Sequence, residues 1–439
     1  MTGLFEGFFS RGRVADEVSD RAWLQAMLDF EAALARATAP PEAAEAIAAA
    51  CVADEFDIGE IGRSVADKGT PVPGLLAALR AKLPGDAAAH LHRGATSQDV
   101  VDSAAMLVAH RALAPLIEDL RGAADACAAL AERHRDTPMA GRTLLQQAAP
   151  TTFGLKAAIW LSGLDEAIWQ FTDIRDNEGL ALQLGGAVGT LAALGEDALE
   201  VVGKVARSLE LPEPALPWHT VRMVPARLAC ALGEASGAIG TVALDIVLLA
   251  QTEVAEVAEG GGEGRGGSST LPHKRNPVGA IAVRACTARV PGLVSTMLAT
   301  MAQEHERGAG TWQAEWETIS ELLRLTGSAA VALREVLEGL EVDAERMRSN
   351  LDATGGLLMT ESVVTALTPS LGRGRAQELV ESAARTALAD GRPVRDVLAS
   401  EAAVMDALGE DGLDAALSPD NYLGVARQLV DRALEARRS

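Results

Sequence analysis

The polar side chains with the clearest chemical potential stand together in one short segment. The segment reads Gly267-Ser268-Ser269-Thr270-Leu271-Pro272-His273-Lys274-Arg275-Asn276-Pro277. A glycine-rich stretch leads into it, and six of the eight residues from 260 to 267 are glycine. Such a glycine-rich backbone cannot hold a helix. Hydroxyl groups, a cation and a carboxamide on a flexible loop can enclose a small anion, exclude water and place a proton acceptor beside it. The segment is a candidate catalytic loop, with a plain Gly/Ser linker as the alternative.

Long amphipathic helices are the elements that would position this loop. After Pro225, a residue suited to the start of a helix, apolar residues recur at alternating spacings of four and three. This stripe consists of Leu228, Leu232, Ala235, Ile239, Val242, Ile246 and Leu249. Similar periodicity predicts a shorter helix around Trp23 to Leu34, and long helices from Asp102 to about His134 and from Trp312 onwards. Such stripes are typical of cores, so they predict a helical bundle.

The composition also favours a wholly helical chain. The sequence is 48% hydrophobic but only 3% aromatic, with a single tyrosine. Stretches rich in Ala, Leu, Glu and Arg favour helix over sheet. We therefore predict an all-α fold. A chain of 439 residues exceeds one ordinary core, which indicates two or three domains.

The net charge and the cysteines exclude several classes of protein. A formal charge of −22 repels nucleic-acid phosphates and anionic lipids, so we expect neither as a partner. The cysteines lie far apart without a C-x-x-C pair, which excludes a disulfide framework and a zinc ribbon; they are Cys51, Cys127, Cys230 and Cys286. No Cys/His cluster or H-E-x-x-H sequence occurs, so we expect no metal site.

The N-terminus and the apolar stretches indicate a cytoplasmic protein. The segment Met1 to Gly7 lacks the basic and long apolar regions of a secretory signal. The most apolar stretch, Ile239 to Ala250, carries Asp245 and is shorter than the ~20 apolar residues that a membrane span requires. We therefore expect no membrane-spanning segment.

Three segments of the chain resemble the signatures of the fumarase/aspartase superfamily. The loop is similar to the family pattern G-S-S-x-M-P-x-K-x-N-P, with Leu271 in place of the usual Met. The segments His92–Asp99 and Gly141–Ala148 follow in family order. Similarity to the 3-carboxy-cis,cis-muconate cycloisomerase branch extends nearly end to end, through Phe8–Gly12, Gln303–Arg307, Trp312–Glu317 and Leu417–Gly424.

The resemblance implies an architecture. It implies a homotetramer whose central bundle combines long helices of four subunits, with each active site assembled from three chains. By pattern and by analogy we predict an N-terminal helical domain at residues 1–98, a central long-helix bundle domain at 99–351 that carries the catalytic loop 260–277, and a small C-terminal helical domain at 352–439. No organic cofactor or metal is implied.

The chemistry of the superfamily passes through an aci-carboxylate dianion, formed beside a substrate carboxylate. The resemblance implies that Ser268 is the general base, acidified by loop N–H groups and nearby cations. Lys274 as a fixed cation and Asn276 as a donor suit stabilisation of the dianion, where one well-aimed donor contributes ~3 kcal/mol. For the cycloisomerase branch, a carboxylate of 3-carboxy-cis,cis-muconate attacks a double bond and 4-carboxymuconolactone forms.

Two departures from the wider superfamily bear on the reaction. Many relatives have His after the Thr of the second motif and Glu five residues after the loop Asn; this chain has Leu144 and Ile281 at these positions. Replacement of both partners leaves no unpaired charge, which is consistent with an enzyme that need not activate water. Gln147 stands where other cycloisomerases often have His, so no acid/base role is transferred to it.

Side chains of the first two motifs are candidates for binding the carboxylates of a small polycarboxylate substrate. These are His92, Thr96, Ser97 and Gln98 in the first motif, Arg142, Thr143, Gln146 and Gln147 in the second, and Ser269 in the loop. Thr96 and Ser97 have an alternative role as helix caps before Asp99. Arg142 suits a carboxylate because guanidinium pairs with it bidentately. For the charged residues of Gln303–Arg307 we expect a charge network and no catalytic role.

The sequence is compatible with three hypotheses about function. The first is the cycloisomerase. The second is a lyase of the same fold that eliminates an amine, nitrite or similar group from a substituted succinate to give fumarate, which the same loop residues would serve. The third is a non-enzymatic helical scaffold, which an intact serine–lysine–asparagine loop disfavours.

Overall fold

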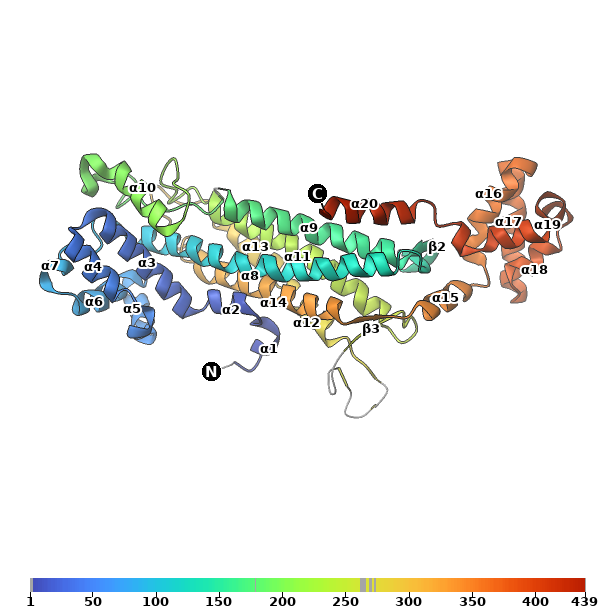
Figure 1. Cartoon of the computed structure of the whole chain (residues 1–439), viewed down its shortest axis with the longest axis horizontal. Coiled ribbons are helices and arrows are strands. Elements are labelled where there is room, and N and C mark those ends of the chain that lie inside the picture. Colours follow the sequence, from blue (N-terminus) through green and yellow to red (C-terminus); the bar gives the residue numbers. More distant parts are fainter. Residues whose placement is uncertain (1–2, 178, 261–265, 268–270, 272–273, 439) are drawn as a thin grey trace. The chain divides into compact units, whose positions relative to one another are not determined.

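The computed structural model describes residues 3–177, 179–260, 266–267, 271 and 274–438. Within them the chain is almost entirely helical, so the predicted all-α class is confirmed (Figure 1). The residues divide into two compact units. The first comprises Met1–Gly122, Glu166–Ala243 and Ile281–Arg334, and the second comprises Ala123–Asp165, Leu244–Ala280 and Glu335–Ser439. The three-domain division drawn from the sequence stays a prediction.

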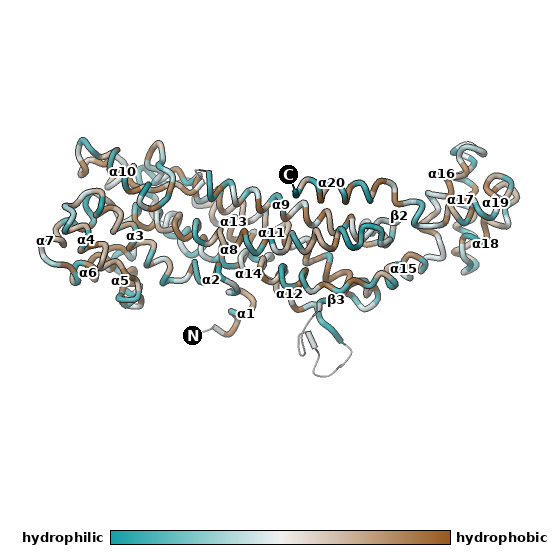
Figure 2. The backbone as a smooth tube through the Cα atoms, in the orientation of Figure 1, coloured by the Kyte–Doolittle hydropathy of each residue, from teal (hydrophilic) through white to brown (hydrophobic). Residues whose placement is uncertain are grey.

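Five helices contribute residues to both units. They are α8 (Ser97–Arg133), α9 (Phe153–Asp176), α11 (Met223–Leu249), α12 (Val278–Thr287) and α14 (Glu315–Glu338). The predicted stripe of α11 is buried along its whole length, from Leu228 to Leu249. Trp312, by contrast, lies buried just before α14 rather than inside it. Figure 2 shows apolar and hydrophilic residues interleaved along α8 and α11, as expected of helices with one buried face.

The rest of the first unit is a set of shorter helices. They are α1 (Glu6–Phe9), α2 (Arg13–Glu17), α3 (Asp20–Thr38), α4 (Pro41–Ala50), α5 (Ile58–Lys68), α6 (Val72–Lys82), α7 (Gly85–Ala88), α10 (Ala198–Leu209) and α13 (Val290–Ala299), with the 3-10 turns η1 (Ala53–Glu55) and η2 (Ala192–Asp197). The predicted helix around Trp23 is α3. Its N-cap Ser19 accepts from the N–H of Ala22, and the helix ends before Pro40 and Pro41. It packs against α4 and α10.

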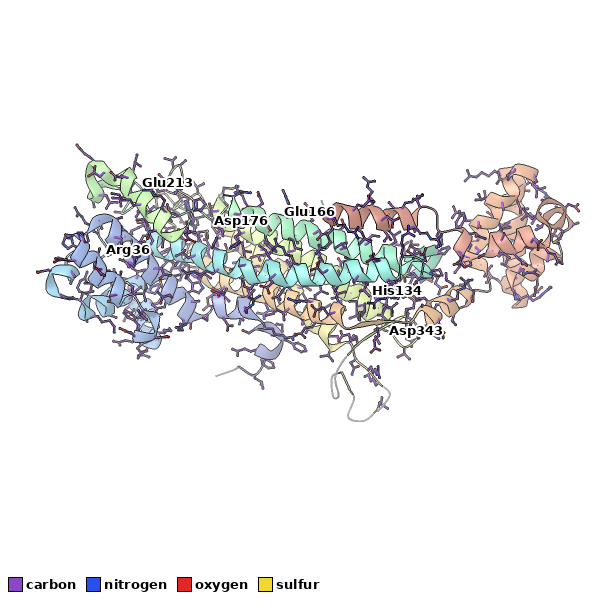
Figure 3. The ribbon with its side chains drawn as sticks, viewed as in Figure 1. Arg36, His134, Glu166, Asp176, Glu213 and Asp343 are labelled. Carbon is purple, nitrogen blue, oxygen red and sulfur yellow. The ribbon has the colours of Figure 1, made fainter. Side chains whose placement is uncertain are left out.

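The second unit contains two small antiparallel strand pairs that the sequence did not predict, of which only the first is a hairpin. The strands β1 (Pro138–Thr143) and β2 (Gln146–Thr152) pair through the turn Leu144-Leu145, where φ is 52° and 64°. The strands β3 (Val257–Glu259) and β4 (Leu340–Val342) form the other. After β4, Asp343 (Figure 3) caps α15 (Ala344–Asp352) by accepting from the N–H of Arg346.

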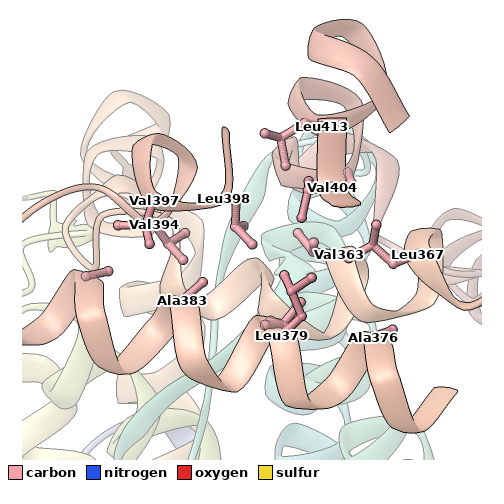
Figure 4. Close-up of a cluster of buried hydrophobic side chains, with 13 residues drawn as sticks. Val363, Leu367, Ala376, Leu379, Ala383, Val394, Val397, Leu398, Val404 and Leu413 are labelled. Carbon is pink, nitrogen blue, oxygen red and sulfur yellow. The ribbon is translucent and has the colours of Figure 1, made fainter. Parts of the chain in front are cut away.

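The C-terminal helices of the second unit have a core of their own. The elements are η3 (Leu357–Met359), α16 (Thr360–Leu371), α17 (Arg373–Asp390), α18 (Val394–Ala399), α19 (Ala402–Leu417), η4 (Pro419–Asn421) and α20 (Ala426–Arg438). Figure 4 shows Val363 and Leu367 of α16 facing Leu379 of α17, with Leu398 and Val404 beside them. All members of this cluster lie between residues 363 and 416.

Among the described residues, three helical segments are long and apolar enough to cross a membrane by length and composition alone. They are α8, α11 and the α12–α13 segment Val278–Ala299. The length argument made from Ile239–Ala250 was therefore wrong, because α11 begins at Met223, well before Ile239, and includes Asp245. In α8, 83% of the most apolar window is buried inside the fold, which identifies this helix as core.

Candidate functional site

The first motif lies in the first unit, where it forms the start of α8. The helix begins at Ser97, and the N–H of Thr96 donates to Asp99 Oδ2 at 2.9 Å. This is the acidic half of a capping box, in which the third helical residue accepts from the cap residue. The capping group is therefore the Asp99 carboxylate, and not the Thr96 or Ser97 side chain that the sequence suggested.

Asp99 is fully buried and has a donor for each oxygen. Oδ1 accepts from the N–H of Gly185 at 2.9 Å and lies 2.7 Å from His219 Nε2, and Oδ2 also accepts from the N–H of Gly186 at 2.9 Å. A buried carboxylate is tolerated only when such donors satisfy it. Asp99 thus joins the first motif to the glycine turn at 185–186.

Gln98 is also fully buried, and both ends of its amide are occupied. Nε2 donates to Asp102 Oδ2 at 3.1 Å and to the carbonyl of His219 at 2.8 Å, and Oε1 accepts from Arg307 Nε at 3.0 Å. These bonds give Gln98 a structural function. Its proposed contact with substrate stays a prediction.

Arg307 is a candidate that sequence reasoning missed. Besides Gln98, it donates to Thr96 Oγ1 at 3.3 Å and to the carbonyl of Ala187 at 3.1 Å. The guanidinium group therefore binds the first motif directly, instead of belonging to a separate charge network. The available signal was its place in Gln303–Arg307, one of the segments that carry the family resemblance.

Beneath the first motif lies a buried ion-pair network. Arg222, 3% exposed, donates to both oxygens of Asp102 at 2.8 and 2.9 Å and to Glu315 Oε2 at 2.5 Å. Trp312 Nε1 also donates to Asp102, at 3.0 Å. Burial raises the pKa of Glu315 despite the opposing effect of Arg222. The network fixes Asp102 one helical turn after Gln98 on α8.

His92, the first residue of the motif, has a left-handed backbone with φ of 59°. Its Nδ1 lies 2.7 Å from Oε1 of the buried Glu31 of α3. The ring keeps 17% of its side-chain exposure. Ser97, by contrast, begins the helix, and its side chain makes no hydrogen bond within the described residues.

The second motif lies in the second unit, on the β1–β2 hairpin. Arg142 donates from Nη1 to Glu256 Oε2 at 2.9 Å and from Nη2 to Oε1 at 2.7 Å. Glu256 is fully buried and also accepts from Asn350 Nδ2 at 2.8 Å. The guanidinium predicted to meet a substrate carboxylate is thus already paired with a protein carboxylate.

The other residues of the second motif surround the hairpin turn. Thr143 and Gln146 pair at its end and are exposed, and Leu144 between them is 97% exposed. Gln147 donates to the carbonyl of Asn350 at 3.2 Å, while its Oε1 is buried without a partner among the described residues. This unsatisfied acceptor is available to a donor that the described chain does not supply.

The loop predicted to be catalytic belongs to the second unit, and Ser268 and Ser269 lie outside the described residues. The Lys274 side chain is exposed, and its backbone N–H donates to the Leu271 carbonyl at 3.0 Å. Asn276 donates to the Gly266 carbonyl from its backbone N at 2.9 Å and from Nδ2 at 3.1 Å. The carboxamide predicted to stabilise the dianion therefore closes the base of the loop with one of its two N–H groups.

Glu259, which directly precedes the glycine-rich stretch, fixes the start of the next helix. Its carboxylate accepts from the N–H groups of Gly279 at 3.0 Å and Ala280 at 2.7 Å, in the first turn of α12. A carboxylate at this position also interacts favourably with the helix dipole. Among the described residues, no group of three or more His, Cys, Asp or Glu side chains is arranged to hold a metal ion.

Comparison with known proteins agrees with the geometry and extends over the whole chain. The family described as Lyase matches residues 4–292, and the adenylosuccinate lyase C-terminus family matches residues 356–433. The 3-carboxy-cis,cis-muconate cycloisomerase of Pseudomonas aeruginosa is 48% identical, over 98% of this chain and 95% of its own length. The nitrosuccinate lyase of Streptomyces davaonensis is 42% identical, over 95% of this chain and 91% of its own length.

A solved structure gives the same result. The 3-carboxy-cis,cis-muconate lactonizing enzyme of Pseudomonas putida superposes with a TM-score of 0.95 at 43% identity, covering 100% of this chain and 99% of that chain. The fold, the ordered motifs and the near-complete coverage all lead to the same conclusion. The chain belongs to the lyase family of the fumarase/aspartase superfamily.

Proposed function

We propose that this chain converts 3-carboxy-cis,cis-muconate to 4-carboxymuconolactone. The observation that carries the proposal is the 48% identity with the Pseudomonas aeruginosa cycloisomerase over nearly all of both chains. A further cycloisomerase, from Bradyrhizobium diazoefficiens, is 45% identical over 95% of this chain. The proposed step needs no external reagent apart from a proton, because the substrate supplies the nucleophile.

The reaction is an intramolecular addition. An oxygen of one substrate carboxylate forms a C–O bond to an alkene carbon, and the π electrons move to the neighbouring carbon. That carbon is stabilised as the aci-carboxylate of another substrate carboxylate, and it then takes a proton to give the lactone. Lys274, exposed and without an ion pair among the described residues, offers an unneutralised cation for the dianion. We assign the proton transfer at the reacting carbon to Ser268, on the family resemblance.

Carboxylate binding is assigned to the two motifs and to Ser269. In the first motif, the hydroxyls of Thr96 and Ser97 and the free edge of His92 are the groups proposed to contact substrate. Gln98 and Arg307 hold that segment in place. In the second motif, the exposed Thr143 and Gln146 side chains can donate to a carboxylate, whereas the unsatisfied Gln147 Oε1 can only accept a hydrogen bond. Arg142 contributes through the hairpin that it anchors.

The active unit is proposed to be a cytoplasmic homotetramer, with each site completed by neighbouring subunits. Large exposed apolar side chains on the long helices α9 and α11 and on the shorter α13 support association, because a neighbouring subunit would remove them from water. They are Ile159 and Trp169 of α9, Leu244 of α11 and Leu298 of α13. Light scattering coupled to gel filtration gives the assembly mass directly. Mixing an inactive first-motif variant with an inactive loop variant should restore part of the activity if sites are shared between subunits.

One alternative has its own support. A lyase that releases nitrite from nitrosuccinate is favoured by the 42% identity to the Streptomyces davaonensis enzyme. The two functions separate in one experiment. Purified protein is mixed with 3-carboxy-cis,cis-muconate, and loss of the diene absorbance is followed in the ultraviolet. Decay that Ser268→Ala and Lys274→Ala abolish supports the cycloisomerase. Absence of decay, with fumarate and nitrite appearing from nitrosuccinate, supports the lyase instead.

A further inference from the structure

The chain contains a histidine–glutamate pair away from the position where many superfamily members have theirs. Leu144 and Ile281 occupy the usual positions. In the first unit, however, His92 Nδ1 lies 2.7 Å from Glu31 Oε1. The two residues are 61 positions apart in the sequence, so the contact is made by the fold.

The environment of Glu31 is costly for a carboxylate. It has 0% exposure and sits in the middle of α3, in a run of buried residues that includes Leu28, Phe30 and Leu34. Its Oε2 has no hydrogen-bond partner among the described residues. A buried carboxylate with a single partner costs several kcal/mol unless that partner compensates, and such costs are concentrated at functional sites.

Other titratable groups near Glu31 do not replace His92 as its partner. Asp29 on the same helix is engaged by Arg111 at 2.7 Å. The Cys51 thiol has its pKa raised to about 12, first by burial and then by Glu31 and Asp29, so it stays neutral and brings no charge. Arg36, the cation near Cys51, is exposed and makes no hydrogen bond or ion pair with Glu31 within the described residues.

The backbone of His92 also needs support. Its φ of 59° is the left-handed conformation, which costs a non-glycine residue roughly 1 kcal/mol. Gly94, with φ of 79°, continues the turn into α8. The hydrogen bond to Glu31 ties the ring of this strained residue to a rigid helix, so the direction of the ring is fixed from outside its own loop.

We propose that Glu31 is a positioning residue that fixes the His92 imidazolium by accepting its Nδ1–H, so that Nε2–H can donate to one carboxylate of the polycarboxylate substrate. An imidazolium whose Nδ1–H is held by a carboxylate has its ring plane set, and only Nε2–H remains to donate to a ligand. The 17% exposure of the His92 side chain leaves that edge accessible. This inference rests on the proposed function for the identity of the substrate.

The test is a double-mutant cycle on the full-length enzyme. Glu31→Gln keeps an acceptor for Nδ1–H and should stay within about threefold of wild type in kcat/KM. Glu31→Leu removes the acceptor and should lower kcat/KM about tenfold or more, the effect that loss of a supporting carboxylate has at metal-binding histidines. The loss should appear in KM. In a His92→Ala background, Glu31→Leu should have no further effect on kcat/KM.

A matched control and a folding measurement separate positioning from stability. Asp29→Asn changes a carboxylate on the same helix and breaks its pair with Arg111, so it should leave KM unchanged. Thermal unfolding and oligomer mass are recorded for every variant. The inference is overturned if Glu31→Leu, folded and assembled, keeps the wild-type KM, or if its kinetic effect persists without His92.

Failure of the proposed function has a different signature. Wild-type protein is assayed first on 3-carboxy-cis,cis-muconate and on nitrosuccinate, and the cycle is run on whichever it turns over. Turnover of nitrosuccinate alone ends the cycloisomerase proposal, yet the cycle still decides the role of Glu31, because both substrates carry carboxylates. If the wild type is active and Glu31→Leu has the wild-type KM, the positioning role of Glu31 is rejected and the proposed function is unaffected.

Discussion

The guanidinium group of Arg142 meets the carboxylate of Glu256 edge to edge, with Nη2 2.7 Å from Oε1 and Nη1 2.9 Å from Oε2. The pair joins the β1–β2 hairpin to the residue just before β3. Asn350 adds a third bond to Glu256 and accepts from Gln147. The second motif is therefore held by a buried polar cluster, and its geometry depends on Glu256.

Glu256→Gln should destabilise the second unit and impair the site together. The change leaves Arg142 without its counter-charge, which costs about 2 kcal/mol for a charged hydrogen-bonded pair. The free energy of unfolding from urea titration measures this. Asp420→Asn breaks the exposed pair with Arg348 and serves as the control, with an expected cost below about 1 kcal/mol. Equal losses for the two variants would contradict the anchoring role.

Arg222→Met should cost about 3–5 kcal/mol at neutral pH, because it leaves Asp102 and Glu315 buried without a cation. The cost should shrink as the pH falls. Burial already raises the pKa of Glu315 above its ordinary value, and loss of Arg222 raises it further. In the folded variant Glu315 then binds a proton that it does not bind in the unfolded chain. The free energy of unfolding of Arg222→Met therefore rises on going from pH 7.5 towards pH 5. Urea titrations across that pH range should show the difference in unfolding free energy between wild type and Arg222→Met becoming smaller. A difference that stays constant with pH would contradict this prediction.

Arg307→Ala should lower kcat/KM about tenfold or more, because the bonds to Thr96 Oγ1 and Gln98 Oε1 that fix the first motif are lost. The neighbouring Glu304→Gln changes an exposed carboxylate in the same segment and should leave kcat/KM within about twofold. Steady-state kinetics on both variants measures the two values of kcat/KM. Wild-type kcat/KM in Arg307→Ala would show that the first motif holds its position unaided.

Lys274→Ala should reduce kcat by about 100- to 1,000-fold, the effect of removing one donor from a developing charge. Stability should not change, since the side chain is exposed. Arg275→Gln is the matched control: it removes the next cation along the loop, one paired with Glu341 at 3.7 Å on the surface. Its kcat should remain near that of wild type. Equal losses in both variants would point to general loop charge and away from a fixed role for Lys274.

Several polar side chains contact partners in the fold other than those predicted from their residue type. Gln98 and Arg142 were predicted to bind substrate carboxylates. In the fold, Gln98 donates to Asp102 and to the His219 carbonyl. Arg142 donates to Glu256. Arg307 was assigned to a charge network and instead contacts the first motif. A polar side chain shows its chemistry in the sequence, but its partner is set by packing.

The β1–β2 hairpin shows why the predicted fold class was right while a local element was missed. Two-residue hairpin turns usually carry Asn or Gly, which tolerate positive φ. Here Leu144 and Leu145 occupy those positions. The strands are also short and lack an apolar alternation. No local signal for the turn was present, so tertiary contacts such as Arg142–Glu256 decide that these residues pair.

The sequence by itself determined the helices and the family. The burial of α11 follows from spacings of three and four, since helical periodicity is a local property that each turn repeats. The loop signature ending in Lys274, Arg275 and Asn276 is likewise contiguous. Only the tertiary structure decided which charges are buried and paired. Glu31, Arg222 and Glu256 look like ordinary charged residues in the chain, but their partners lie 61, 120 and 114 positions away. Pairing across such distances depends on how the helices pack, which no short window of sequence contains.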